Sequence, residues 1–144
     1  MLVSDLLRRK GDFVATAPPD MTVAALLDRL AEHGIGALVV SADGAAVDGI
    51  VSERDVVRAL RESGAALLDA PVSEVMTRDV VVTGPGEPLE AIMLLMTERR
   101  IRHLPVVTGG RLAGIVSIGD VVAGRISELQ SDRDSLVDYI SSAG

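Results

Sequence analysis

Two short segments of the chain place a hydroxyl and a carboxylate three residues apart, directly after an apolar run. The first is Gly49-Ile50-Val51-Ser52 followed by Asp55, and the second is Gly114-Ile115-Val116-Ser117 followed by Asp120. An apolar run that ends in serine before a charged segment predicts a strand that passes directly into a helix. At such a junction the hydroxyl accepts a backbone N–H of the first turn, and the carboxylate interacts favourably with the positive end of the helix dipole.

The same kind of junction can also hold a ligand. Backbone N–H groups at a helix N-terminus attract phosphate and polar sugar groups, and a nearby carboxylate accepts hydrogen bonds from a vicinal diol. Because a carboxylate repels phosphate at short range, this arrangement suits a ribose at Asp55 or Asp120 with a phosphate a short distance away. Capping and ribose binding are compatible interpretations, and both remain open for each copy.

A phosphate needs a positive partner, and the chain has a basic segment between residues 98 and 105. Arg99 and Arg100 fall near the end of a predicted helix, where cations complement the dipole and are solvated. Arg102 and His103 fall past that end, at the start of a predicted strand, and are candidates for phosphate binding. The corresponding first-copy segment, residues 32–39, has no arginine. We therefore expect one site with phosphate chemistry and a second that is weaker, empty or used for another ligand.

These junctions belong to a duplicated sequence. Apolar residues at positions 23, 26, 27 and 30 have the spacing of an amphipathic helix, and the pattern recurs at 89, 92, 93 and 96. The same shift of 66 positions carries Ile35 to Ile101, Leu38 to Leu104 and Val40 to Val106. The shift falls to 65 at the two junctions, so one residue is lost in the hairpin turns that Asp43-Gly44 and Gly109-Gly110 predict. This register indicates a tandem repeat.

Each copy predicts the same order of elements, β-α-β-β-α, and therefore an α/β (α+β) fold. The first strands are expected at Phe13–Thr16 and Val80–Thr83, and the second helices are expected to begin at Glu53 and Ile118. We place repeat 1 at residues 1–66, repeat 2 at 67–126 and a C-terminal helical extension at 127–144. Half of a small domain buries too little surface to be stable alone, so the repeats should pack about a pseudo-twofold axis.

An apolar stripe continues beyond the second junction. It has 4-3-4-3-4 spacing at positions 122, 126, 129, 133, 136 and 140, and only Arg133 interrupts it. This spacing predicts one long helix. Such a helix either lies on its own domain or forms a dimer contact, in which Arg133 would tune the register at some cost in stability.

Composition excludes several classes of function. A net charge of -7, a single lysine (Lys10) and 1% aromatic residues argue against binding nucleic acid, which needs clustered cations or stacking rings. The chain has no cysteine, so disulfides and thiolate metal sites are excluded, and two isolated histidines do not make a zinc site. No apolar run approaches the ~18 residues of a membrane span, and no signal-peptide pattern opens the chain, so we expect a cytoplasmic protein.

The doubled Gly-Ile-Val-Ser-x-x-Asp motif, the segment from Arg100 to Val107 and the order of elements resemble a tandem pair of CBS domains, regulatory modules named after cystathionine beta-synthase. The resemblance covers the chain from Val3 to about Ile126. It implies a disc-like module with two clefts that senses AMP, ADP, ATP or S-adenosylmethionine and requires no cofactor. The residues that it places at the ligand are Thr16, Ser52, Arg54, Asp55, Thr83, Arg102, His103, Ser117 and Asp120. One departure is Val39, which replaces the proline of the family's Leu-Pro-Val strand.

The resemblance also implies association. Members of this family usually pair, so a homodimer through the disc faces and the C-terminal helix is expected, and a regulated partner protein is compatible with this. A ligand-free protein interaction module is the alternative function. Catalysis is not expected: Ser117, His103 and Asp120 are the residue types of a hydrolytic triad, but Asp120 starts the same helix as Ser117 and is poorly placed to orient a histidine.

Overall fold

The computed structural model describes residues 1–11 and 13–143. The helices are α1 (Val3–Lys10), α2 (Val23–His33), α3 (Glu53–Ser63), α4 (Leu89–Arg99) and α5 (Ile118–Ala143), with short 3-10 helices η1 (Gly64–Asp69) and η2 (Val72–Glu74). The strands are β1 (Thr16–Ala17), β2 (Ala37–Val40), β3 (Gly49–Ser52), β4 (His103–Thr108) and β5 (Arg111–Ser117). The mixed α/β fold is therefore confirmed, and α3 and α5 begin at the predicted residues.

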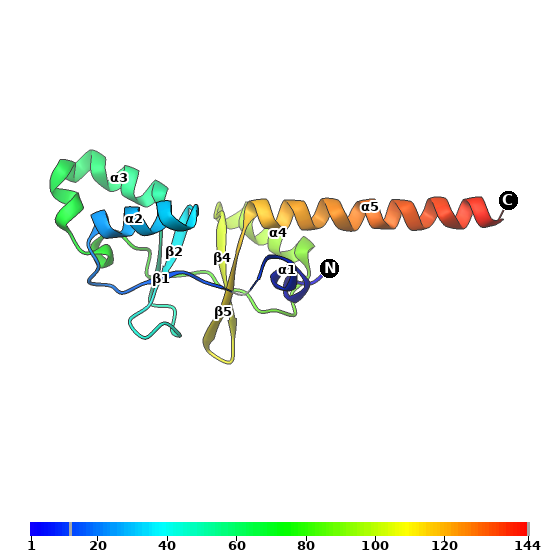
Figure 1. Ribbon diagram of the computed structural model, residues 1–144, viewed down its shortest axis with the longest axis horizontal. Helices are drawn as coiled ribbons and strands as arrows, with labels where there is room; N and C mark the ends of the chain where they lie inside the picture. Colours follow the sequence, from blue (N-terminus) through cyan, green and yellow to red (C-terminus); the bar gives the residue numbers. More distant parts are fainter. Residues whose placement is uncertain (12, 144) are drawn as a thin grey trace.

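The first half of the chain is a small sheet covered by helices (Figure 1). Strand β1 pairs in parallel with β2, and β2 pairs antiparallel with β3. Helix α2 makes the crossover between β1 and β2. Its N-cap is Thr22, whose Oγ1 accepts the Ala25 N–H at 3.2 Å, and its C-cap is Gly34, which lies in the left-handed region (φ 62°). Every residue of β2 is buried, so this strand lies at the centre of the first core.

The second half repeats this plan with a two-stranded sheet. Strands β4 and β5 pair antiparallel, and α4 comes directly before β4 in the chain. The strand predicted at Val80–Thr83 is wrong in extent: only Thr83 pairs, through a parallel bridge to Val106. The strand predicted at Phe13–Thr16 is likewise reduced to Thr16–Ala17. Ala15 and Val81 of these segments pack against the two cores, but Phe13 and Val82 are 71% and 42% exposed, and neither segment pairs along the length predicted for it.

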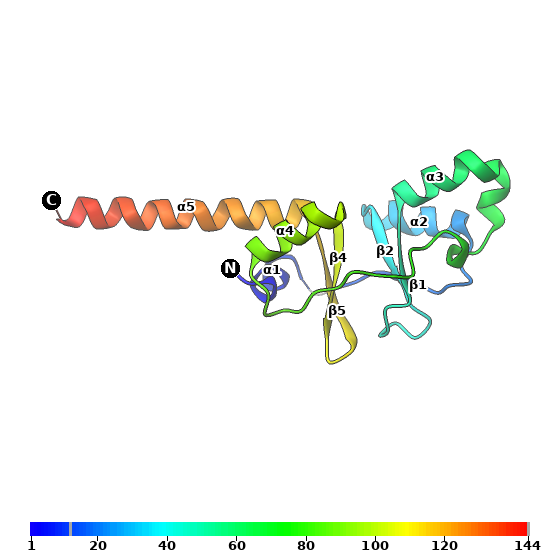
Figure 2. The same ribbon diagram turned by 180° about the vertical axis from the view of Figure 1, so that it is seen from behind.

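The two halves exchange their leading segments. Val3 and Leu6 of α1 lie in the core of the second half, and the Val3 N–H donates to the Glu87 carbonyl at 2.9 Å. Val72 of η2 lies in the core of the first half, where its N–H donates to the Met21 carbonyl at 2.7 Å. In Figure 2, α1 lies near α4 and the start of α5. The division at 66/67 describes the sequence repeats, whereas the packed cores contain segments from both sides of it.

Helix α5 extends far past the body of the molecule (Figure 1). Its first turns are anchored because Val121 and Gly124 are buried, and a Cβ on Gly124 would approach Leu89 to 2.8 Å. From Leu129 onward the helix is exposed, as the predicted extension requires. In the part of the chain that the structure describes, no helix combines the length and apolar character needed to cross a membrane.

Candidate functional site

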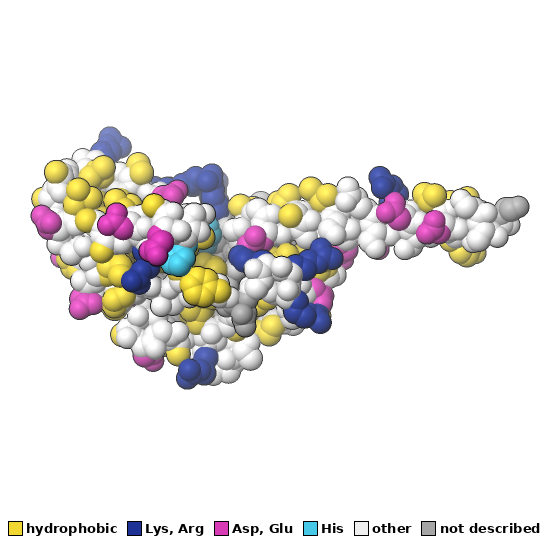
Figure 3. Space-filling model, viewed as in Figure 1, with side chains coloured by type: hydrophobic (Ala, Val, Ile, Leu, Met, Phe, Trp, Pro, Cys, Tyr) yellow, Lys and Arg dark blue, Asp and Glu magenta, His cyan; other side chains and the backbone are white. Residues whose placement is uncertain are grey.

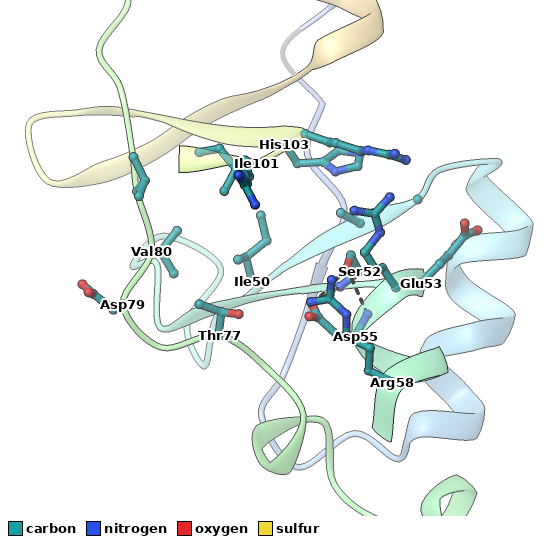
Figure 4. A pocket seen from close by; sticks show the side chains of 16 residues that line it. Ile50, Ser52, Glu53, Asp55, Arg58, Thr77, Asp79, Val80, Ile101 and His103 are labelled. Carbon is teal, nitrogen blue, oxygen red and sulfur yellow. Dashed lines mark hydrogen bonds between the residues drawn. The ribbon is translucent and has the colours of Figure 1, made fainter. Parts of the chain in front are cut away.

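A cavity of about 310 Å³ lies between the two halves. From the first half it is lined by Gly36, Ala37, Ile50, Ser52, Glu53, Arg54, Asp55 and Arg58, and from the second by Arg100, Ile101, Arg102 and His103. The connecting segment contributes Thr77, Asp79, Val80 and Val81. Figure 4 shows Asp55 and Arg58 on one side of this space, with Ile101 and His103 on another. The cavity thus combines the first junction motif with the basic segment of the opposite repeat.

The first motif is held rigidly at the start of α3. The Asp55 N–H donates to Ser52 Oγ at 3.3 Å, while Asp55 Oδ2 accepts the Ser52 N–H at 2.8 Å and the Ser52 hydroxyl at 3.0 Å. This is the reciprocal capping box that the sequence predicted. All of these bonds to the carboxylate end on Oδ2. Its other oxygen, Oδ1, accepts no hydrogen bond from the described residues and is available to a ligand.

Four arginines line the same cavity. Arg54 and Arg58 come from α3, and Arg100 and Arg102 come from the segment between α4 and β4. Within residues 1–11 and 13–143, none of the four forms an ion pair with an acidic side chain. Two acidic side chains besides Asp55, Glu53 and Asp79, also line the space. The cavity therefore has an excess of positive charge, which suits a phosphate-bearing ligand.

Arg100 has an unusual backbone. It ends α4 in the left-handed region (φ 54°, ψ 45°), and among the described residues it is the one non-glycine with positive φ. The equivalent position of the first repeat is Gly34, which adopts the same conformation without a side-chain clash. Non-glycine residues in such conformations are strained, and strain of this kind is concentrated at functional sites. Arg100 therefore replaces the conformationally favoured glycine at a position that faces the cavity.

Replacing Arg100 with glycine is expected to stabilise the fold while weakening a phosphate-bearing ligand. Relief of the left-handed strain, less the entropy that glycine adds to the unfolded chain, should raise the free energy of unfolding by about 0.5–1 kcal/mol. Urea unfolding measures the first effect and isothermal titration the second. The matched control is Arg99→Gly, which sits one residue earlier inside α4 and should be destabilised. A destabilised Arg100→Gly protein would contradict the strain argument.

The second motif has the same capping geometry but a different neighbour. Asp120 Oδ2 accepts the Ser117 N–H at 2.9 Å, and the Asp120 N–H donates to Ser117 Oγ at 3.1 Å. Lys10 Nζ, at the end of α1, also lies 2.6 Å from Asp120 Oδ2. Burial raises the pKa of Asp120, but the bonds from Lys10 and Ser117 outweigh it and hold the pKa below its ordinary value. Neither Ser117 nor Asp120 lines the cavity at Asp55.

A comparison with known proteins places these motifs in a family. The family model described as "CBS domain" matches residues 3–62 and 72–126. The chain belongs to the CBS-domain family. It is 48% identical to the CBS-domain protein ATU1752 of Agrobacterium tumefaciens, whose crystal structure superposes with a TM-score of 0.83 over 87% of this chain and 99% of that chain. It is 35% identical to the mitochondrial CBS-domain protein CBSX3 of Arabidopsis thaliana, over 96% of this chain and 71% of the relative.

One structural neighbour contains ligands. The CBS domain pair of protein MJ0100 was crystallised in complex with 5'-methylthioadenosine and S-adenosyl-L-methionine. It is 26% identical to this chain, with a TM-score of 0.76 over 85% of this chain and 98% of that one. The fold of this chain therefore occurs in a CBS domain pair that binds two adenosine-containing ligands.

The CBS cavity brings together part of the predicted ligand set. Five of the nine residues line it: Ser52, Arg54, Asp55, Arg102 and His103. Thr16 lies outside it, with its carbonyl accepting Arg29 Nη1 at 2.6 Å, and Thr83 is nearly buried beside a separate hollow under α4. Sequence reasoning missed Arg58 and assigned Arg100 to the helix dipole alone. The alignment of Arg100 with Gly34 was the available signal for the latter.

His103 begins β4 at the centre of this charged region. Burial lowers its pKa below the ordinary value of 6.5, and the positive charges of Lys10 and Arg102 lower it further, against the opposing effect of Asp120 and Glu53. The ring stands near Gly36, whose added Cβ would lie 3.7 Å from it. His103 is therefore a neutral hydrogen-bonding group at neutral pH, and the positive charge in the cavity comes from the arginines.

This lowered pKa predicts a loss of stability in mild acid. Because the folded-state pKa of His103 lies below the unfolded value, the unfolded chain takes up the proton first as pH falls, and stability decreases below about pH 6.5. His103→Gln should show a smaller decrease between pH 7.5 and 5.5 in urea unfolding. His33→Gln, which alters an exposed histidine, is the matched control. Equal acid sensitivity in the wild-type and His103→Gln proteins would contradict a lowered pKa for His103.

Proposed function

We propose that this CBS pair senses an adenine nucleotide in the cavity at Asp55. The observation that carries the proposal is the shared cavity: Asp55 on one repeat faces a space that Arg100 and Arg102 of the other repeat also line. The Asp55 carboxylate would accept the ribose hydroxyls through Oδ1, and the arginines would bind the phosphates. The role is regulatory binding without catalysis and without a further cofactor, and the cytoplasmic location remains a prediction from the sequence.

The charge of the cavity favours a nucleotide over S-adenosylmethionine. The sulfonium and ammonium groups of S-adenosylmethionine would enter a space in which four arginines outnumber the three acidic side chains, Glu53, Asp55 and Asp79. A di- or triphosphate would instead be attracted by the same guanidinium groups. We therefore rank ATP and ADP above AMP, and AMP above S-adenosylmethionine. The first of these preferences follows from charge and the second from the absence of phosphate.

A nucleotide held this way would act by linking the two repeats. Its ribose would bind at α3 of the first repeat, and its phosphates would bind where α4 passes into β4 of the second. A ligand shifts a conformational equilibrium only through its different affinities for the two states. Because the ligand groups contact both repeats, its affinity depends on how the repeats are placed, which makes the cavity suited to signalling.

Thermal unfolding with AMP, ADP, ATP and S-adenosylmethionine tests the proposal. At about 100 times the dissociation constant, a ligand stabilises the folded protein by ~2.7 kcal/mol. For a domain of this size the melting temperature should rise by roughly 5–11 °C. ATP or ADP should give the largest rise. No rise with any adenosyl ligand would refute the proposal and favour the alternative, a ligand-free interaction module.

Homodimerisation through α5 is the second part of the proposal. The apolar stripe of α5 is exposed along its length, with Ile126, Leu129, Leu136 and Ile140 each more than half accessible. Figure 3 shows apolar side chains spaced along the part of α5 that extends from the body. The stripe lies on a different face of α5 from the buried Val121 and Gly124. The body of the protein therefore does not cover the stripe. This favours a dimer contact over a surface helix.

The spacing of the stripe favours an antiparallel pair. A 4-3-4-3-4 pattern reads the same in both directions, so two copies centred near Ser131 can match along the whole stripe. The matched positions are Val122 with Ile140, Ile126 with Leu136, and Leu129 with Arg133. In a parallel pair the two Arg133 side chains would instead meet in the seam and repel one another.

A further inference from the structure

Lys10 is held against the second motif by the fold. Its Nζ lies 2.6 Å from Asp120 Oδ2 and 2.9 Å from the Ile115 carbonyl. Helix α1, which ends at Lys10, is fixed because Val3 is fully buried and Leu7 covers Gly114, where an added Cβ would approach Leu7 to 2.7 Å. This lysine is therefore placed by a docked helix, unlike a surface side chain that meets an acid by chance.

The leading segment that packs on the first motif has a negative charge, Asp79, where the one on the second motif has the positive charge of Lys10. Met76 covers Gly49 in the first repeat as Leu7 covers Gly114 in the second, so the two leading segments can be aligned on these contacts. Three residues further along, the segment that packs on the first half has Asp79, which lines the cavity, and the segment that packs on the second half has Lys10. The two junction motifs are thus identical in their caps, and they differ in the charge that the leading segment brings to them.

We propose that Lys10 is a specificity-determining residue that excludes a ribose from Asp120, so that each chain holds one nucleotide, at Asp55. This inference rests on the proposed function. The Asp120 carboxylate already accepts bonds at Oδ2 from the Ser117 N–H and from the Lys10 ammonium, and the ammonium compensates the negative charge that would attract sugar hydroxyls. A neutral diol that displaces the ammonium must replace a charge-assisted bond with a weaker one. Asp55 has no such competitor among the described residues.

Removing the lysine should open a second site. We would saturate the cavity with ATP and then follow adenosine binding by equilibrium dialysis up to millimolar concentration. Adenosine is uncharged, so the loss of a lysine charge does not by itself alter its attraction to the protein. The wild-type chain should bind no further adenosine, whereas Lys10→Ala and Lys10→Met should each bind one equivalent. Asp120→Ala in the Lys10→Ala background should abolish that equivalent.

Arg9→Ala is the matched control. It removes one positive charge from the same helix, where Arg9 donates to Ser127 Oγ at 3.1 Å and does not contact Asp120. It should bind no adenosine once the cavity is filled. Adenosine binding by the wild type, or none by either Lys10 variant, would overturn the role of Lys10 while leaving ATP binding at Asp55 intact. Failure of ATP to saturate the wild-type protein would instead overturn the proposed function, and this inference with it.

Discussion

Asp55→Ala is expected to weaken ATP binding by about 100-fold or more, while Asp120→Ala leaves it nearly unchanged. A carboxylate that accepts two ribose hydroxyls makes two hydrogen bonds to a charged group, each worth ~1.5–3 kcal/mol, and every ~1.4 kcal/mol is a tenfold change in affinity. Asp55 supplies such a group to the cavity, and Asp120 does not line it. Isothermal titration of both variants with ATP measures the difference.

Comparing Asp55→Ala with Asp120→Ala separates a loss of ligand contact from a loss of folding stability. Each aspartate closes the same reciprocal cap with the serine before it, so each alanine removes a cap worth about 1 kcal/mol. Asp120→Ala additionally removes the ion pair with Lys10 and should be no more stable than Asp55→Ala. Asp55→Asn, which keeps the shape of the side chain, guards against loss of folding. Equal losses of affinity in Asp55→Ala and Asp120→Ala would show that the cap, rather than the ribose contact, governs binding.

Leu136→Asp is expected to convert the proposed dimer to a monomer. Leu136 is 59% exposed in the single chain, so its replacement should leave the stability of the monomer almost unchanged. In a pair of α5 helices it would be buried twice, once in each copy, at ~1.5–3 kcal/mol for each side chain. The dimer dissociation constant should therefore rise by at least 100-fold. Sedimentation velocity across a range of protein concentrations measures the change.

Ser135→Asp is the matched control for this variant. It introduces the same charge at the neighbouring position, which faces away from the stripe, and should leave association unchanged. Arg133→Leu should strengthen association by completing the apolar seam. The chain has no native cysteine, so single cysteines report the direction of pairing. A mixture of Ile126→Cys and Leu136→Cys should form a mixed disulfide, whereas efficient self-crosslinking of Leu136→Cys would indicate parallel helices.

Much of the fold could be predicted because its signals are local. The caps at Ser52 and Ser117 join residues three apart, and the stripe of α5 repeats within each pair of turns. Such patterns depend on the geometry of one helix and are visible in any window of sequence. The first strand of each repeat was predicted too long, because the length of a strand depends on the neighbouring strand, which local residues do not specify.

Five of the nine residues predicted at the ligand line the cavity, and how the two repeats would bring them together was not predicted from the sequence. The resemblance placed Asp55 and Asp120 in equivalent roles, although the first motif has Glu53 and Arg54 where the second has Ile118 and Gly119. The cavity at Asp55 forms because the opposite repeat delivers Arg100, Arg102 and His103 to it. The surroundings of each motif therefore depend on packing between repeats, which a single sequence window does not contain.

By itself the sequence determined that this protein is a duplicated α/β unit with two capped strand–helix junctions and a long C-terminal helix, because each of these depends on residues close together in the chain. Only the tertiary structure decided that the leading segments cross between the cores and that Lys10 meets Asp120, a contact across 110 residues. The physical reason is that such contacts arise from burial of α1 against the second half of the chain. That burial brings an otherwise ordinary lysine to one of two identical motifs.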